Sequence, residues 1–162
     1  MRLADFPAGH TIFLDSNCLI YHFTGTFESC ALILERAARR ELHAVTSAIV
    51  LTEVHHRLML LEAVQELPRR PRNLPAFLKA HPEIIRRSQR CEDAFSKLQA
   101  FRLRVLPITR RLAFEAQRIS HELGLLTNDA LITATMRAHH LTHLASNDTD
   151  FARVPDLILW RP

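Results

Sequence analysis

Short apolar runs alternate along this chain with longer segments in which apolar residues recur at helical spacing. Runs of the first kind are typical of buried strands, and segments of the second kind are typical of helices that cover a core. The runs predict strands over residues 11–15, 43–46, 102–108, 142–146 and 156–160. The other segments predict helices over residues 16–22, 27–40, 47–67, 82–101, 109–123 and 129–140. Strands that alternate with helices indicate an α/β fold with a parallel sheet between helical layers.

Polar residues and prolines mark where these elements are expected to begin and end. Serine, threonine and asparagine side chains can accept hydrogen bonds from the first backbone N–H groups of a helix. The caps expected on this basis are Ser16, Asn17, Ser47, Thr109 and either Thr127 or Asn128. Gly124 is the expected end of one helix, because glycine readily adopts the left-handed conformation that ends many helices. Residues 68–75, PRRPRNLP, contain three prolines and three arginines, which predicts an exposed loop and not a domain boundary.

Four acidic residues, Asp15, Glu53, Asp129 and Asp148, lie at or soon after the point where an expected strand passes into a helix. The carboxyl ends of parallel strands meet at one crevice, so these side chains are expected to converge. Carboxylates within a few ångströms of one another cannot all stay ionised unless a cation compensates their charge. The pattern therefore predicts a site for Mg²⁺ or Mn²⁺, which prefer oxygen ligands.

Each of these acids, taken alone, also has an ordinary structural explanation. Asp15 could bond the backbone amides that follow it, and Asp129 could favour the positive end of a helix dipole. Asp148 and Asp150 could be turn residues, and Glu53 could be a solvated residue on a helix. A shared metal site explains their joint placement at one edge of a sheet better than independent coincidences do.

Composition narrows the class of protein. At 162 residues, with 48% hydrophobic residues, the chain is expected to form one domain over residues 1–162. No apolar run reaches the roughly 18 residues of a membrane span, and the first residues lack the apolar stretch of a signal peptide. Three cysteines without a CxxC pair favour a reducing cytoplasm over a disulfide framework. The net charge of +4, nearly all arginine, suits a polyanionic partner such as a nucleic acid.

Other chemistries lack their sequence signatures. The chain has three glycines and no glycine-rich phosphate loop, which argues against a P-loop or dinucleotide-binding protein. Glu53 and His56 form the only ExxH unit, whereas di-iron helical bundles use two. The HExxH motif of zinc proteases is absent, and no serine or cysteine has the context of a nucleophile elbow.

The order and context of the acids resemble the PIN domain family, and within it the VapC-like toxins of prokaryotic toxin–antitoxin pairs. The matching segments are FLDSNCLIY, the helix with Glu53, TNDALITATMRAHH and LASNDTDF, and together they span residues 11–160. The resemblance implies a three-layer α/β/α fold with a mostly parallel sheet of four to five strands. The segment between Glu53 and Asp129 is longer than in compact members, with residues 68–75 as the extra material.

For function, the resemblance implies an endoribonuclease that depends on Mg²⁺ or Mn²⁺. Asp15 and Asp129 would be the most direct metal ligands, with Asp148 and Asp150 completing the site. Glu53 would orient or deprotonate the attacking water. The residues expected to hold the acids or the scissile phosphate are Ser16, Asn17 and Ser146. Hydrolysis by a metal-activated water would leave 5′-phosphate and 3′-hydroxyl ends.

The resemblance also implies partners, namely an RNA substrate, a cognate antitoxin whose tail fills the crevice, and a second copy in a homodimer. Two other interpretations stay open. One is a PIN-type ribonuclease that processes RNA without an antitoxin, and the other is a scaffold that binds RNA or protein without cleaving it. The complete set of acids argues against the scaffold, because a protein that has lost its activity usually lacks at least one ligand.

Overall fold

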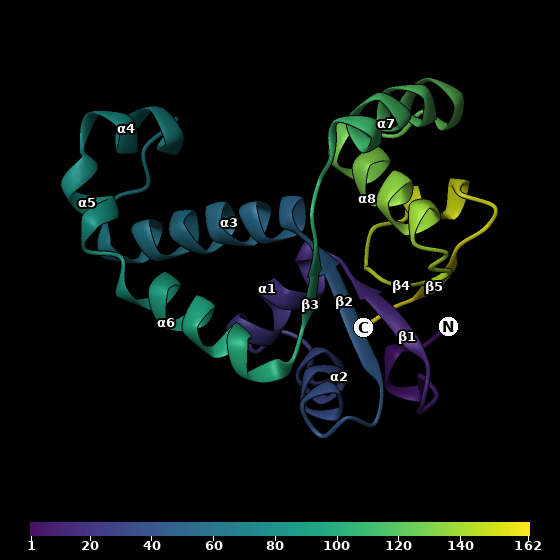
Figure 1. The fold of residues 1–162 in the computed structure, drawn as a ribbon. Helices are drawn as coiled ribbons and strands as arrows, with labels where there is room; N and C mark the ends of the chain where they lie inside the picture. The colour runs from purple at the N-terminus through teal and green to yellow at the C-terminus, as the bar shows by residue number, and fades with distance from the viewer.

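The computed structural model describes residues 1–162 and contains one sheet of five parallel strands (Figure 1). The strands are β1 (Thr11–Leu14), β2 (His43–Ser47), β3 (Arg104–Leu106), β4 (His143–Ala145) and β5 (Ile158–Trp160). Their order across the sheet is β3-β2-β1-β4-β5, so the first strand lies in the middle. Every neighbouring pair is parallel, which confirms the predicted sheet and all five predicted strands.

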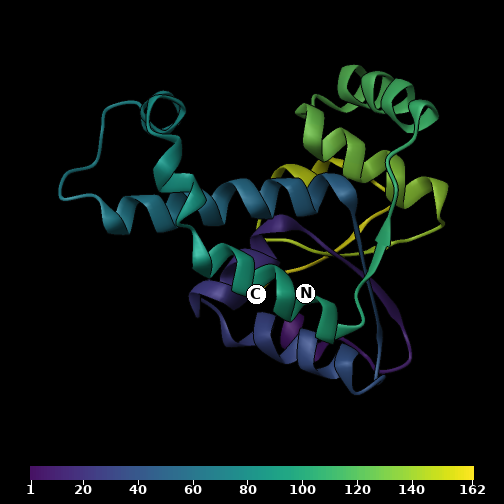
Figure 2. The same ribbon diagram turned by 60° about the vertical axis from the view of Figure 1, so that its left-hand side comes forward.

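Helices cover both faces of the sheet and give the predicted three-layer arrangement (Figures 1 and 2). The helices are α1 (Ser16–Thr24), α2 (Glu28–Ala38), α3 (Ala48–Glu66), α4 (Leu74–Ala80), α5 (Pro82–Arg86), α6 (Gln89–Leu98), α7 (Arg110–Leu123) and α8 (Thr127–Ala138). The short 3₁₀ helices are η1 (Leu3–Asp5), η2 (Gln99–Phe101) and η3 (Asp150–Arg153). Helices α7 and α8 pack side by side, whereas α1 packs on α2 and α3. None of the helices combines the length and apolar character that crossing a membrane requires.

The central strands are buried because they are uninterrupted apolar runs. Ile12, Phe13 and Leu14 of β1 have no exposed surface. A parallel sheet needs such runs, since helices cover both of its faces. The free cysteines of the chain are Cys18, Cys30 and Cys91, and all belong to the same core. They act there as small apolar side chains, and none of them is paired in a disulfide bond.

The outer half of α3 leaves the sheet and supports a projection that we call the arm (Figure 1). The arm consists of the outer half of α3 and residues 67–98, which include α4, α5 and α6. Helix α6 returns beside α3 toward the sheet (Figure 2). A small apolar cluster of Ala63, Leu74 and Leu78 holds α4 against α3. The arm therefore has a minor core of its own, separate from the main core.

A buried carboxylate joins the two long helices of the arm. Glu62 of α3 accepts hydrogen bonds from the Ser88 hydroxyl and from the backbone N–H groups of Arg90 (3.0 Å) and Cys91 (3.1 Å). These amides open α6 and have no partner within that helix. Burial raises the pKa of Glu62, but the hydrogen bonds outweigh burial and hold this pKa below its usual value. Glu62 is therefore an ionised cap supplied from a neighbouring helix.

The predicted single helix over residues 82–101 is wrong. The chain there is divided into α5, α6 and η2, with a break at Arg87 and Ser88. The break turns the first amides of α6 toward Glu62. Because this contact joins residues far apart in the sequence, local spacing could not reveal it.

The predicted loop over residues 68–75 is correct in part. Residues 68–73 lie between helices, but α4 begins at Leu74 and includes Pro75. The Asn73 side chain caps α4 by accepting a hydrogen bond from the Ala76 N–H at 3.1 Å. Proline is tolerated in the first turn of a helix, because the N–H group that it lacks would have no partner there.

Predicted boundaries at two other helices are confirmed. The Thr109 side chain caps α7 by accepting a hydrogen bond from the Leu112 N–H at 3.3 Å. Gly124 ends α7 in the left-handed conformation, with φ of 66°. Ser47 lies at the cap position of α3, as predicted, but its buried hydroxyl has no hydrogen-bond partner.

The predicted caps of α1 and α8 are wrong. Asp15 itself caps α1. Leu126, which has no polar side chain, precedes α8. The residues predicted as caps that lie inside the first turns are Ser16, Asn17, Thr127 and Asn128. Their side chains are therefore available for contacts across the carboxyl edge of the sheet.

Replacing Glu62 by alanine is expected to lower the free energy of unfolding by about 1–3 kcal/mol, since it leaves buried donors of α6 without an acceptor. Chemical denaturation measures this change. The matched control is Glu66→Ala, at the exposed end of the same helix, for which a change within about 0.5 kcal/mol is expected. Equal effects of the two substitutions would contradict the capping role.

Candidate active site

Three neighbouring strands bring the predicted acids to one edge of the sheet. β1 lies between β2 and β4, and all three run in the same direction. Asp15 directly follows β1, and Asp148 follows β4 after two residues. Glu53 lies in the second turn of α3, which begins where β2 ends, and Asp129 lies in the first turn of α8. The topology therefore places carboxylates from four segments of the chain at the carboxyl edge.

Asp15 is the most constrained of these acids, with only 5% of its surface exposed. Its Oδ1 atom accepts a hydrogen bond from the Ser16 N–H at 2.6 Å. Its Oδ2 atom accepts hydrogen bonds from Asn17 Nδ2 at 2.6 Å and from Ser146 Oγ at 2.7 Å. Donors that follow β1 and a donor that directly follows β4 thus fix the orientation of this carboxylate. Ser16 takes part through its backbone amide.

The turn after β4 is organised around the same group. Ser146 Oγ accepts hydrogen bonds from Asn17 Nδ2 at 2.9 Å and from the Asp148 N–H at 3.0 Å. Asn17 Oδ1 accepts a hydrogen bond from the Asn147 N–H at 3.1 Å. Asp148 Oδ1 in turn accepts from the Asp150 N–H at 2.8 Å. Asn17 and Ser146 therefore tie the β1 and β4 ends together, which positions Asp148 beside Asp15.

Burial and neighbouring acids raise the pKa of both Asp15 and Asp129. Burial raises the pKa of Asp15 to about 6, with smaller contributions from Glu53 and Asp148, against the opposing hydrogen bonds of Ser146 and Ser16. Burial also raises the pKa of Asp129 to about 6, and Asp148 is the next largest cause. The further carboxylates that raise the pKa of Asp129 are Asp15, Asp150 and Glu53. These acids therefore share one electrostatic environment.

Cations within the protein compensate this charge unequally. Asp150 forms an ion pair with Arg153, with 2.9 Å between Oδ1 and Nη2. Asp15 and Asp129 form no ion pair. Glu53 and Asp148 also form no ion pair, so Asp150 is the one acid of this site that a cation of the protein already neutralises in part. The sequence pattern gave no indication of Arg153 beyond its position three residues after Asp150.

Glu53 is half-buried and faces α8 across a polar pocket. The Asn128 Nδ2 group donates a hydrogen bond to Glu53 Oε2 at 3.3 Å. The pocket contains no hydrophobic residue, and its lining consists of Thr52, Glu53, His56, Arg57 and Asn128. Asn128 was predicted as a possible helix cap, so its contact with Glu53 is a site feature that sequence reasoning missed. An open polar pocket beside a carboxylate suits a water molecule or a phosphate oxygen.

The donor set fits a hard divalent cation, because every candidate ligand is a carboxylate oxygen. In the structure itself, no three aspartate, glutamate, histidine or cysteine side chains are grouped closely enough to hold a metal ion. Repulsion between ionised carboxylates opposes a closer approach until a cation compensates their charge. Burial is the main cause of the raised pKa values of Asp15 and Asp129, and the neighbouring carboxylates add to it.

Sequence comparisons identify relatives of this chain. The sequence profile of the PIN domain matches residues 12–157, which is nearly the whole chain. The chain is also 31% identical over 144 residues to Ribonuclease VapC2 of Methanocaldococcus jannaschii, and the match covers 88% of both proteins.

Solved structures share the fold. VapBC2 from Rickettsia felis, bound to a DNA fragment from their promoter, matches with a TM-score of 0.60 and 24% identity, over 93% of this chain and 98% of that one. VapC20 of Mycobacterium tuberculosis, a toxin that cleaves the sarcin–ricin loop, matches with a TM-score of 0.60 and 17% identity, over 90% and 96%. The structural likeness supports the fold, and the sequence matches establish the relationship. The chain belongs to the PIN domain family and to its VapC-like members.

Proposed function

We propose that this protein is a divalent-metal-dependent endoribonuclease that acts as the toxin of a toxin–antitoxin pair. The observation that carries the proposal is the convergence of carboxylates from four segments of the chain at one edge of the sheet, with Asp15 buried and no ion pair to Asp15 or Asp129. The pKa of Asp15 and of Asp129, raised to about 6 mainly by burial, agrees with this. Such an arrangement is unfavourable in a purely structural site and favourable in a site that binds a cation. The relationship to Ribonuclease VapC2 supports the nuclease activity.

Asp15 and Asp129 would hold Mg²⁺ or Mn²⁺, and Asp148, with Asp150, would complete the ligand set. When bound, the cation lowers the pKa of a coordinated water and neutralises charge that develops on the phosphate oxygens. The hydrogen bonds from Ser16, Asn17 and Ser146 keep Asp15 in a fixed orientation, so that little reorganisation is needed during the reaction.

Glu53 is the proposed group that orients the attacking water and accepts its proton. It lies at the polar pocket between α3 and α8, where Asn128 fixes one carboxylate oxygen and leaves the other free to accept a hydrogen bond. A carboxylate that binds water in this way can act as a general base. Attack by water, and not by the ribose 2′-hydroxyl, then determines which ends the products carry.

The toxin assignment includes a cognate antitoxin as partner, a homodimer and a cytoplasmic location. Its support is the relationship to VapC2, together with a shared fold with VapBC2, a toxin–antitoxin pair. A PIN-type ribonuclease that processes RNA without an antitoxin would have the same acids. The two proposals differ in one observable, because only a toxin should arrest growth on expression and be relieved by a co-expressed antitoxin.

Asp15→Asn and Asp129→Asn are each expected to lower the rate of RNA cleavage about a hundredfold or more, because each removes a charged ligand. Cleavage of a fluorescent single-stranded RNA in Mg²⁺ or Mn²⁺ measures the rate, and EDTA should abolish it. Asp93→Asn, an exposed carboxylate on α6, is the matched control and should leave the rate unchanged. Wild-type rates in both site variants would exclude the proposed chemistry.

The products are expected to carry 5′-phosphate and 3′-hydroxyl ends. A 5′-phosphate-dependent exonuclease should degrade the downstream fragment, and poly(A) polymerase should extend the upstream fragment without prior phosphatase treatment. Fragments that resist extension because they end in a 2′,3′-cyclic phosphate would contradict attack by water.

In the metal-free protein, the contribution of Asp15 and Asp129 to stability is expected to fall as pH rises from about 4 to above 6. The sign follows from the pKa values, because the folded state binds protons more tightly than the unfolded chain at Asp15 and Asp129. Asp129→Asn should therefore raise the free energy of unfolding near neutral pH, by about 1 kcal/mol after allowance for solvent screening.

Thermal unfolding measures this effect as a rise in Tm of roughly 2–4 °C for Asp129→Asn without metal. Added Mg²⁺ or Mn²⁺ should raise the Tm of the wild type more than that of the variant. A variant that is less stable than the wild type near neutral pH, or that gains equally from metal, would count against mutual repulsion at the site.

A further inference from the structure

Three of the exposed arginines that have no acidic partner lie along α3 and the loop before α4. Arg57, Arg70 and Arg72 are all solvent-exposed, and none of them takes part in an ion pair. They line one groove, together with Asn73 and the apolar or proline residues Leu60, Leu61, Val64, Pro71, Leu74 and Pro75. The groove contains no carboxylate. The groove therefore presents cationic side chains around an apolar floor.

This groove continues into the candidate active site. Arg57 lies one helical turn after Glu53 on α3, so both side chains are on the same face of the helix. Arg57 also lines the polar pocket that contains Glu53 and Asn128. The two hollows thus have Arg57 in common in their linings.

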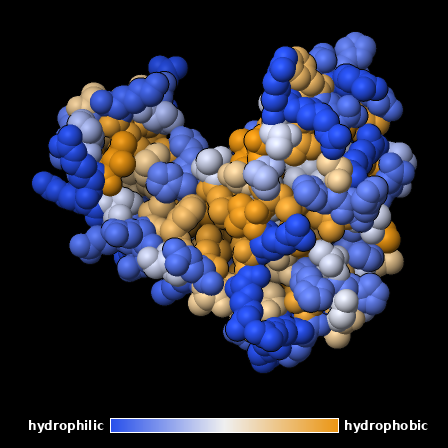
Figure 3. All heavy atoms as spheres, in the orientation of Figure 1, coloured by the Kyte–Doolittle hydropathy of each residue, from blue (hydrophilic) through white to orange (hydrophobic).

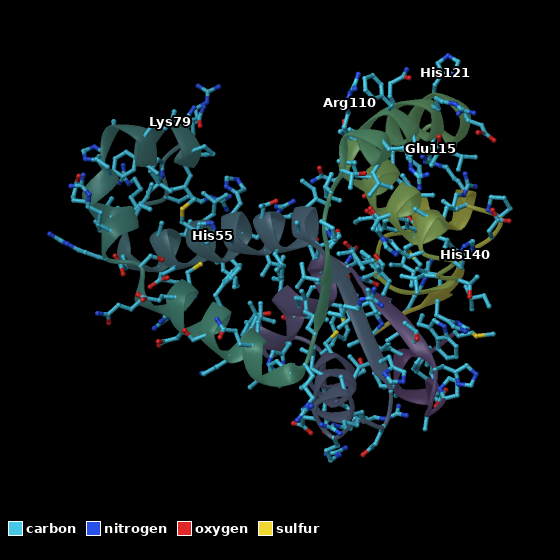
Figure 4. The ribbon with its side chains drawn as sticks, viewed as in Figure 1. His55, Lys79, Arg110, Glu115, His121 and His140 are labelled. Atoms are coloured by element: carbon cyan, nitrogen blue, oxygen red, sulfur yellow. The ribbon has the colours of Figure 1, made fainter.

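The shape of the molecule agrees with a continuous path. The surface is hollowed between the arm and the α7–α8 pair, and α3 forms the floor of the hollow (Figure 3). Lys79 on α4 and Arg110 at the start of α7 lie on the two sides of this hollow, so both of its rims carry positive charge (Figure 4). Apolar atoms are exposed on its inner surface, and Leu61 is 43% exposed.

The side chains of the groove can contact both the phosphate groups and the bases of a nucleic acid strand. Arginine stays charged at all physiological pH values and can donate two hydrogen bonds to one phosphate. Arginine guanidinium planes can also stack on unstacked bases, which are present in single-stranded RNA and absent from a duplex. The aliphatic floor of the groove can contact the same bases. The acidic site alone would repel a polyanion, so a substrate needs compensating positive charge beside it.

We propose that Arg57, Arg70 and Arg72 form a track that binds single-stranded RNA on one side of the scissile phosphate. The strand leaves the acidic site at Glu53, passes Arg57 and follows the groove to the loop before α4. The proposal rests on the proposed ribonuclease function for its substrate. It assigns a role in substrate positioning to the loop over residues 68–73, between α3 and α4.

Equilibrium binding of a fluorescein-labelled single-stranded oligoribonucleotide tests the track. The measurement uses anisotropy, with EDTA present and Asp129→Asn as a background that does not cleave. On that background, Arg57→Ala and the double variant Arg70→Ala/Arg72→Ala are compared with the parent. The matched control is Arg86→Ala/Arg87→Ala, two exposed arginines on the same arm that do not line the groove.

Each arginine removed from the track is expected to weaken binding about two- to fivefold at low salt. The slope of log K against log salt concentration should decrease by about 0.7 for each arginine, as for phosphate contacts on a single strand. The control should change neither quantity, and all variants should keep the parent's Tm. Unchanged affinity and slope in the track variants, or equal losses in the control, would overturn the proposal.

Cleavage kinetics separate this proposal from the ribonuclease function. In the otherwise wild-type protein, Arg70→Ala/Arg72→Ala should raise KM with little change in kcat, since these side chains are remote from the reacting phosphate. Normal KM with active cleavage would refute the track and leave the ribonuclease intact. If the wild-type protein does not cleave RNA but the track variants still bind RNA more weakly than the parent, the ribonuclease function is refuted and the RNA-binding track is supported. If the track variants bind RNA as tightly as the parent but bind an acidic polypeptide more weakly, the groove is a site for a protein partner and the proposal is overturned.

Discussion

The convergence of carboxylates at the carboxyl edge of the sheet is the constraint around which the candidate site is built. Parallel strands bring Asp15 and Asp148 together at adjacent strand ends, and α3 and α8 add Glu53 and Asp129. Hydrogen bonds from Asn17 and Ser146 hold Asp15 in place, although burial and its neighbours raise its pKa. The fold maintains this arrangement without an ion pair to Asp15 or Asp129, which agrees with the proposed binding of an external cation.

Charge is separated across the molecule in a way that serves such a site. The acids lie where the strands end, and unpaired arginines lie on the arm, with Arg57 between the two regions. The arm stays attached through the buried Glu62, which caps α6, and through a small apolar cluster of its own. The proposed catalytic site and the proposed RNA track would thus occupy different parts of the chain that are joined along α3.

Much of this arrangement follows from the sequence, because it depends on local patterns. The apolar run before Asp15 determines a buried strand, and the parallel topology then determines which acids meet. Contacts between distant segments are beyond such reasoning. The break before α6 depends on Glu62, the orientation of Asn128 depends on Glu53, and the partial neutralisation of Asp150 depends on Arg153. The catalytic and metal-binding roles, and a single domain over residues 1–162, stay predictions.

The most direct test of the account is a crystal grown with Mn²⁺ and measured at a wavelength that reveals its anomalous scattering. The account predicts an anomalous peak within coordination distance of Asp15 and Asp129, with both carboxylates drawn closer together than in the metal-free protein. A map with no peak at this edge of the sheet, at Mn²⁺ concentrations that support cleavage, would contradict it.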